Sequence, residues 1–151
     1  MHGASTREQE ITTNQQLAKI IELLKQRIEP VEIEGGVLDF SYELDPDEET
    51  TLEEKMPWNG YVMSAIINWP SGCSNLAGVR ITVDDLRVVP RNAQWIALND
   101  VTIEVPISRK IQKDRLIVVD MKNNDTTFTH YLTVLITVYN YFPGFVQLGV
   151  L

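Results

Sequence analysis

The stretch TFTHYLTVLITVYNY, residues 127–141, decides the fold of this chain. Its two alternating sets are His130, Leu132, Val134, Ile136 and Val138 on one side and Tyr131, Thr133, Leu135, Thr137 and Tyr139 on the other. Both sets are apolar or amphiphilic, and β-branched and aromatic residues dominate, as in a packed strand. The stretch therefore predicts a strand covered on both faces, inside a β-sandwich or barrel. We expect four of its residues to be almost fully buried: Leu132, Val134, Leu135 and Ile136.

Short alternating segments separated by turn residues precede this strand. They are Val37–Leu44, Gly60–Trp69, Gly78–Asp84, Leu86–Val89, Gln94–Leu98, Val101–Ile107 and Arg115–Met121. About eight strands at a spacing of about ten residues are typical of an all-β sandwich. No helical window interrupts them, which disfavours a parallel sheet with crossover helices. We predict an all-β fold, an antiparallel jelly-roll-like β-sandwich over residues 35–141, with an immunoglobulin-like sandwich as the alternative.

Breaks between the segments carry their own signals. Residues 45–55, DPDEETTLEEK, predict a long solvated loop, because Asp45-Pro46 favours a turn and the segment is acidic. The carboxylates of this segment lack the spacing and the central glycine of a calcium-binding loop, so a metal site is disfavoured. Asp84-Asp85 predicts a hairpin turn, and Pro106 indicates an edge strand or a strand end.

A short amphipathic helix is predicted before the sandwich. Thr13 and Gln16 fit a capping box, and Pro30 ends the helix near Glu29. The heptad seam that follows the cap is Leu17, Ile21, Leu24 and Ile28. Such a helix can pack on its own sandwich or form a short bundle with copies of itself. We favour the bundle, because the helix precedes the β region instead of interrupting it, although two heptads do not fix the number of copies.

The last ten residues, FPGFVQLGVL (142–151), are apolar, whereas free tails are usually polar. We predict that this tail docks on a neighbouring subunit or shell protein, with folding back onto its own sandwich as the alternative. The residues predicted to make the contact are Phe142, Phe145, Val146 and Leu148. The predicted organisation is thus an N-terminal arm with an oligomerisation or docking helix (1–34), a β-sandwich domain (35–141) and a C-terminal tail (142–151).

Charge is unevenly distributed along the chain. The formal net charge of −8 argues against nucleic acid as a partner. Residues 1–55 hold 14 acidic and 5 basic side chains, whereas residues 76–122 hold 6 acidic and 8 basic ones. Two differently solvated faces would explain this, as would acidic and basic regions that meet between neighbouring copies. No apolar run reaches the roughly 20 residues of a membrane helix, and the N-terminus lacks a signal-peptide pattern, so we expect a soluble protein with no membrane partner.

Few residues suggest chemistry. One cysteine, Cys73, and two histidines, His2 and His130, do not make a zinc site. No base and orienting carboxylate are placed beside a nucleophile, and no glycine-rich phosphate loop occurs. We therefore expect no catalytic residues, no cofactor and no metal. Trp58, Trp69 and Trp95 could instead form a sugar-stacking platform, an interpretation that weakens if they are buried and gains if they line an open groove.

One long segment supports a resemblance. At CSNLAGVRITVDDLRVVPRNAQWIALNDVTIEVPISRKIQKDRLIVVDMKNND…THYLTVLITV, about residues 73–138, the chain resembles small β-sandwich virion proteins of tailed bacteriophages. The shared features are an N-terminal helix or arm, one antiparallel sandwich, the turn-separated ALND stretch, a basic loop ending in KD and a closing strand rich in Val and Ile. The 45–55 segment and the apolar tail depart from this pattern.

The resemblance implies a non-enzymatic viral structural protein, a capsid decoration or cement protein or a head-fibre protein, made in the host cytoplasm and located on the capsid surface of the virion. Because decoration proteins often sit on local three-fold axes, it also implies a homo-oligomer, a trimer. The implied partners are other copies of the chain and the major capsid protein or another virion protein. The alternative is a carbohydrate- or receptor-binding module of a fibre.

Overall fold

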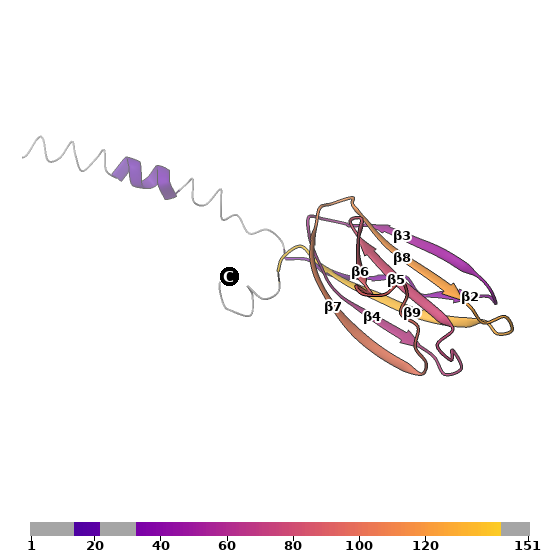
Figure 1. Cartoon of the computed structure of the whole chain (residues 1–151). Coiled ribbons are helices and arrows are strands. Elements are labelled where there is room, and N and C mark those ends of the chain that lie inside the picture. Colours follow the sequence, from indigo (N-terminus) through magenta and orange to yellow (C-terminus); the bar gives the residue numbers. More distant parts are fainter. Residues whose placement is uncertain (1–13, 22–32, 143–151) are drawn as a thin grey trace, which may run out of the picture. The chain divides into compact units, whose positions relative to one another are not determined.

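The computed structural model describes residues 14–21 and 33–142, in two compact units that comprise residues 1–32 and 33–151 (Figure 1). In the first unit, residues 14–21 form a helix. No helix among the described residues is long and apolar enough to cross a membrane.

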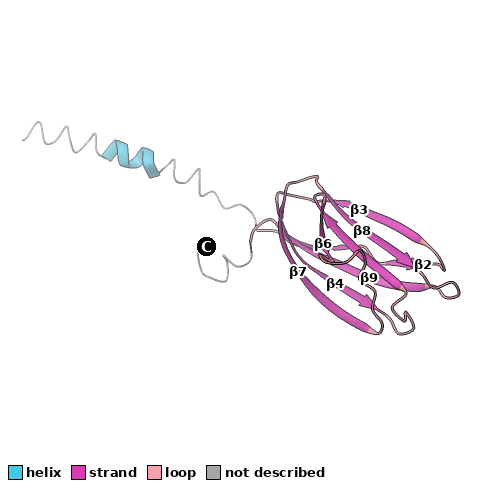
Figure 2. Ribbon diagram, in the orientation of Figure 1, coloured by secondary structure: helices cyan, strands magenta, loops and turns pink. Residues whose placement is uncertain are grey.

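The second unit is a two-sheet antiparallel β-sandwich, which confirms the predicted fold class (Figure 2). Its described strands are β1 (Gly35–Asp39), β2 (Tyr42–Leu44), β3 (Glu49–Lys55), β4 (Gly60–Trp69), β5 (Ala77–Val83), β6 (Leu86–Val89), β7 (Val101–Ile111), β8 (Leu116–Asn123) and β9 (His130–Tyr139). One sheet has the order β1-β9-β4-β7, with β2 also paired to β9, and the other has the order β3-β8-β5-β6.

The strand order is that of a jelly roll. β1 and β2 both pair with β9, so they are two parts of one strand that is interrupted at Phe40 and Ser41. Counted this way, the strands form four nested antiparallel pairs, first with last: β1/β2 with β9, β3 with β8, β4 with β7, and β5 with β6. A long hairpin that is rolled up on itself gives this nested pairing. The result is the eight-stranded, double-sheet arrangement that was expected from the sequence.

Two local predictions are wrong. The acidic segment was expected to be a loop, but residues 49–55 form β3, which pairs with β8 along its whole length. Thr50 and Leu52 are partly buried while Glu49, Thr51 and Glu53 are exposed, so Glu49 and Glu53 lie on the water-facing side of an edge strand. Gln94–Leu98 was expected to be a strand, but it makes only one isolated bridge, between Ile96 and Val79.

The strand β9 lies at the centre of its sheet, but only one of its faces is buried. Leu132, Val134 and Ile136 point into the core and are 0% exposed, as predicted. Leu135 is only partly buried, so the expectation of cover on both faces is wrong. In a two-layer sandwich each sheet has one face toward its partner sheet, and the other face stays at the surface whatever its composition.

Two local sequence predictions are confirmed, a hairpin turn and an edge strand. Asp84 and Asp85 connect β5 to β6 with φ angles of 49° and 63°, the left-handed conformations that a type I′ hairpin turn requires. Pro106 lies in β7, an edge strand of its sheet, where a residue without a backbone N–H removes no ladder bond on the open side.

Candidate functional site

The two predicted attachment segments join the sandwich at the same end (Figure 1). The backbone N–H of Glu34 donates to Asn140 Oδ1 at 2.8 Å, and the N–H of Asn140 donates to the carbonyl of Glu34 at 3.0 Å. These bonds extend the pairing of β1 with β9, in which Gly35 lies opposite Tyr139. The chain therefore enters and leaves the sandwich on neighbouring strands, and we call this its arm end.

The described part of the helix carries an apolar stripe. Leu17, Ile20 and Ile21 are spaced three and four residues apart, so they share one helical face. Their side chains are 54%, 52% and 45% exposed. The structure thus places two predicted interface residues, Leu17 and Ile21, on one open stripe, whereas Leu24 and Ile28 lie outside the described residues.

At the arm end the described part of the tail begins on an aromatic surface. The ring of Phe142 lies edge-on to that of Tyr61 with centroids 5.4 Å apart, and Tyr139 meets Tyr141 in the same way at 5.3 Å. Of the predicted docking residues only Phe142 is described, and it is partly buried; Phe145, Val146 and Leu148 lie outside the described residues. The three tyrosines were not among the predicted site residues, although the alternation of β9 placed Tyr139 on the face opposite its core residues.

This aromatic surface continues along the outer face of the five-stranded sheet. The cross-strand register brings Tyr61 opposite Tyr139, Ser64 opposite Thr137 and Ile66 opposite Leu135. The hydroxyl groups of Ser64 and Thr137 are 2.8 Å apart and hydrogen-bond to each other. This part of the face is therefore built mainly from aromatic, aliphatic and hydroxyl side chains, with the carboxylate of Glu104 on β7 opposite Ile66.

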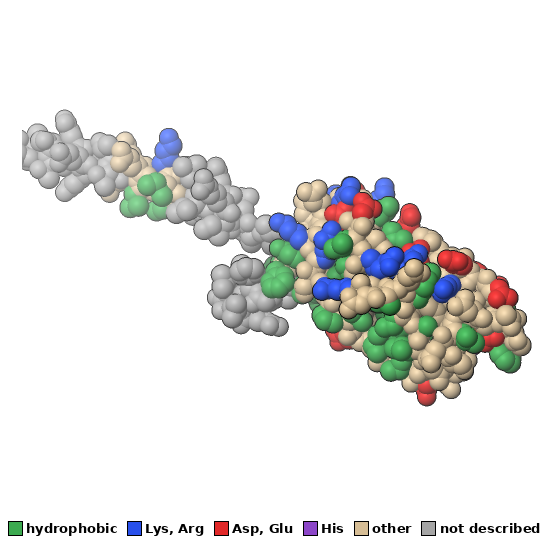
Figure 3. All heavy atoms as spheres, viewed as in Figure 1, with side chains coloured by type: hydrophobic (Ala, Val, Ile, Leu, Met, Phe, Trp, Pro, Cys, Tyr) green, Lys and Arg blue, Asp and Glu red, His purple; other side chains and the backbone are tan. Residues whose placement is uncertain are grey.

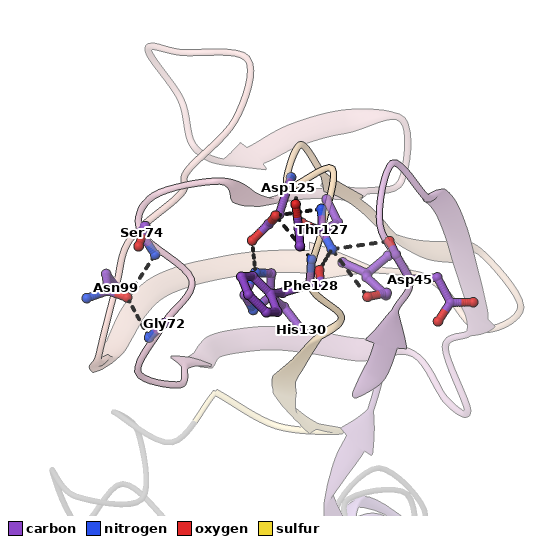
Figure 4. A network of polar contacts seen from close by, with 10 residues as sticks. Asp45, Gly72, Ser74, Asn99, Asp125, Thr127, Phe128 and His130 are labelled. Atoms are coloured by element: carbon purple, nitrogen blue, oxygen red, sulfur yellow. Dashed lines mark hydrogen bonds and ion pairs between the residues drawn. The ribbon is translucent and has the colours of Figure 1, made fainter.

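The opposite end of the sandwich is closed by a polar network around Asp125 (Figure 4). Asp125 Oδ1 accepts from the backbone N–H groups of Thr127 and Phe128 at 2.9 and 3.2 Å, and Oδ2 lies 2.8 Å from Nε2 of His130. Asn123 extends the network, because its side-chain amide donates to the carbonyl groups of Leu44, Asp45 and Phe128. The network ties the β8–β9 loop to the end of β2.

These bonds set the electrostatics of the network. They hold the pKa of Asp125 below its ordinary value, first through the N–H of Thr127 and then through His130, because each bond favours the ionised carboxylate. His130 is 6% exposed, which confirms that it is a packed histidine. The neighbouring Cys73 is fully buried, and burial, followed by the charge of Asp125, raises the pKa of its thiol. A thiol kept neutral and out of solvent is a poor nucleophile, so the arrangement serves to close the loops.

A second bond set holds the adjacent loop. Asn99 Oδ1 accepts from the backbone N–H groups of Gly72 and Ser74 at 3.1 and 2.8 Å (Figure 4). Gly72 has a φ of 97°, which a side chain would strain. Within the described ranges no three His, Cys, Asp or Glu side chains gather in a way that could hold a metal ion.

The three tryptophans do not converge on one site. Trp69 is fully buried and donates its indole N–H to the carbonyl of Ala77 at 2.9 Å. Trp95 is partly buried on the four-stranded sheet, where Arg80 and Lys122 lie 4.4 and 4.7 Å from its ring centroid. Trp58 is also partly buried, packed against the core. The sugar-platform interpretation weakens accordingly.

Comparison with protein-family models gives no match, and comparison with curated protein sequences gives none either. Several solved structures are similar in fold. The Yersinia pseudotuberculosis-derived mitogen has 15% identity and a TM-score of 0.41, over 69% of this chain and 86% of that chain. The structure of the infectious bursal disease virus Gx strain has 9% identity and a TM-score of 0.40, over 72% of this chain and 32% of that chain. The capsid asymmetric unit of cyanophage Pam1 has 10% identity and a TM-score of 0.39, over 73% of this chain and 84% of that chain. This chain thus spans about a third of the bursal disease virus chain, and these similarities carry no conclusion about function.

Proposed function

We propose that this chain is a non-enzymatic virion structural protein, a capsid decoration or cement protein of a bacteriophage. In this proposal the N-terminal arm joins copies into a trimer, and the arm end of the sandwich docks on the major capsid protein. The observation that carries the proposal is the open apolar stripe of the helix, formed by Leu17, Ile20 and Ile21.

An isolated helix needs such a partner. Helices shorter than about 12–15 residues are marginal in water, and most helical stability in proteins comes from packing an apolar face. The stripe is in register with the sequence seam that continues through Leu24 and Ile28, so identical helices could bury it against each other with a heptad repeat. Closed cyclic symmetry is the usual arrangement of soluble homo-oligomers, and a trimer is one such solution.

The arm end offers a surface for the second contact. Arm and tail join the sandwich there on neighbouring strands, beside the rings of Tyr61 and Phe142. Tyrosine and other aromatic residues are enriched in protein interfaces, and charged residues are depleted at interface centres. The opposite end is closed by the Asp125 network. A sandwich with attachment segments at one end, and with loops held together by hydrogen bonds at the other end, suits a protein that binds to the surface of a shell.

The fold supports the proposal only by analogy. Jelly rolls occur in viral capsid domains and in lectins, and a fold by itself does not fix a function. The choice between these two uses rests on the site. The fibre lectin alternative required converging tryptophans, and Trp69 and Trp95 lie in different surroundings.

The assembly is tested by light scattering on the full chain. In about 1 M salt, where contacts between surface charges are screened, we expect three times the mass of one chain at micromolar concentration, and a shift to single chains for Ile21→Asp, which places a charge on the stripe. Gln15→Asp adds the same charge to the helix away from the predicted seam and should keep the wild-type mass. A wild-type monomer, or equal masses for the two variants, would contradict the proposed bundle.

The virion assignment needs its own measurement. Mass spectrometry of particles purified from the organism that encodes the chain should find this protein in the shell fraction. Its absence from such particles would overturn the assignment, even if the helical bundle were correct.

A further inference from the structure

A groove runs along one side of the sandwich, between the edge strands β6 and β7 of the two sheets. It has a volume of about 570 Å³, and we call it the basic groove. Its walls include the cations Arg87, Arg91, Arg109 and Lys110 and the apolar residues Leu86 and Ile107, and no carboxylate lines it. Figure 3 shows blue side chains gathered over this part of the surface. The groove is thus a concentrated positive site on a chain whose net charge is −8.

Most of this charge has no partner within the described residues. Arg109 is held by the turn between β5 and β6, because Nε donates to the carbonyl of Val83 at 3.0 Å and the guanidinium also reaches that of Asp84 at 3.4 Å. The side chains of Arg87, Arg91 and Lys110 make no hydrogen bond or ion pair within the described ranges, and these residues are exposed. By contrast, the nearby Arg115 is paired with Asp84 and Asp85. Three uncompensated cations in a shaped groove favour an anionic occupant.

The opposite side of the same sandwich carries the complementary charge. The edge strands there are β3 and the β1/β2 strand, and β3 pairs only with β8 among the described strands. The exposed acidic residues of this side are Asp39, Glu43, Asp45, Asp47, Glu49, Glu53 and Glu54, against one exposed cation, Lys55. Figure 3 shows red side chains where β3 lies. We call β3 with these residues the acidic edge.

The geometry points to a second copy of this chain as the occupant. We infer that the basic groove of one copy binds the acidic edge of the next, through Arg87 and Lys110 on one side and Glu53 and Glu54 on the other. The two surfaces lie on opposite sides of each sandwich, so the contact is head-to-tail: it closes into a ring where the rotation allows and otherwise extends. It is a different contact from the helical bundle and does not depend on it.

Side chains, and not a continuous sheet, would form this contact. The edge of β7 is interrupted by Pro106 and by Ser108, whose φ of 53° marks the extra residue opposite the register shift between Val62 and Ser64. Bulges and prolines of this kind prevent strand addition to an exposed edge. The β6 edge is only four residues long. Contact energy would therefore come from exposed ion pairs, which are individually weak and strongly screened by salt.

A charge-exchange experiment on the full chain tests this inference. One variant carries Arg87→Glu and Lys110→Glu, which places two carboxylates opposite Glu53 and Glu54. The other carries Glu53→Lys and Glu54→Lys, which places two ammonium groups opposite Arg87 and Lys110. Each variant alone should lose at least about tenfold in association constant, measured by sedimentation, which corresponds to about 1.4 kcal/mol. Mixing the two variants should restore association, because the Glu pair of one variant then meets the Lys pair of the other, and Arg87 and Lys110 of the second meet Glu53 and Glu54 of the first.

Controls separate this contact from the helical bundle. All variants are also made with Ile21→Asp, and the rescue on mixing should persist in that background. Lys113→Glu reverses a charge in the β7–β8 loop outside the basic groove and should change association by less than about twofold, as expected for a screened surface charge. Raising the salt concentration from about 0.01 M to about 1 M shortens the Debye length from about 30 to about 3 Å and should abolish the contact.

Two results would overturn the inference. If the charge variants associate as the wild type does, or if mixing gives no rescue, the acidic edge is not the occupant. If groove reversal removes binding to a heparin column but leaves self-association unchanged, the basic groove serves a polyanion and not a second copy.

Discussion

Asp125 shows how one carboxylate can organise a loop end. It accepts from two backbone N–H groups and contacts His130, so its ionised form is stabilised in the folded chain and its pKa is lowered. A group whose folded pKa is depressed contributes stability above its unfolded pKa, about 3.9 for aspartate. That contribution is lost as the pH falls through the folded value.

Asp125→Asn should therefore lower the free energy of unfolding at pH 7. Its deficit relative to wild type should shrink in acid, as the pH falls from about 3.9, the unfolded pKa of aspartate, through the lower folded pKa of Asp125. Urea denaturation across this pH range measures both effects. Asp100→Asn provides a matched control in an exposed turn, and a deficit for Asp125→Asn that stays constant down to pH 2 would contradict the electrostatic explanation.

At the scale of elements, β9 carries the core on one face only. Ile136 is 0% exposed and points between the sheets, whereas Leu135, its neighbour in sequence, lies on the outer face opposite Ile66. The position of each side chain relative to the partner sheet, and not its hydrophobicity, decides how much it contributes to the stability of the fold.

Truncation of the two neighbours should separate these contributions. We expect Ile136→Ala to cost about 2–5 kcal/mol, the usual range for removing a buried aliphatic side chain and leaving a cavity. Leu135→Ala should cost about 1 kcal/mol, near the centre of the distribution for point substitutions. Thermal or urea unfolding of both variants gives the comparison, and equal costs would mean that the outer face is covered in solution.

At the scale of the whole molecule, the sandwich has an arm end with attachment segments, a loop end closed by polar bonds and two sides of opposite charge. Deleting residues 143–151 keeps Phe142 against Tyr61 and should leave a folded sandwich with weakened assembly. Circular dichroism and light scattering distinguish the two effects. A double-mutant cycle of Phe142→Ala and Tyr61→Ala in the full chain isolates the edge-on ring pair, which should contribute about 0.5–1.5 kcal/mol. A deletion that unfolds the sandwich would place the tail in the core and remove the support for a docking role.

Particular residues show which features of the fold and of the site could be predicted from the sequence. Strict alternation separated the two residue sets of β9, and the paired aspartates at 84 and 85 identified a hairpin turn, because both signals are local. The alternation of Thr50 and Leu52 was a weaker signal for β3, because five charged residues surround them in residues 48–55. The segment was therefore predicted to be a loop. The Asp125 network was not predicted at all, because Asn123 joins it to the carbonyl groups of Leu44 and Asp45 in a segment far away in the sequence.

The sequence by itself determined the all-β class, the two alternating residue sets of the closing strand and the apolar stripe of the helix, because periodicity and turn chemistry act over a few residues. Only the tertiary structure decided that Leu135 stays at the surface, that Glu34 meets Asn140 at one end, and that the basic groove and the acidic edge lie on opposite sides. Each of these depends on which distant strands pair, and that pairing is fixed by how the whole nested hairpin rolls up around one core.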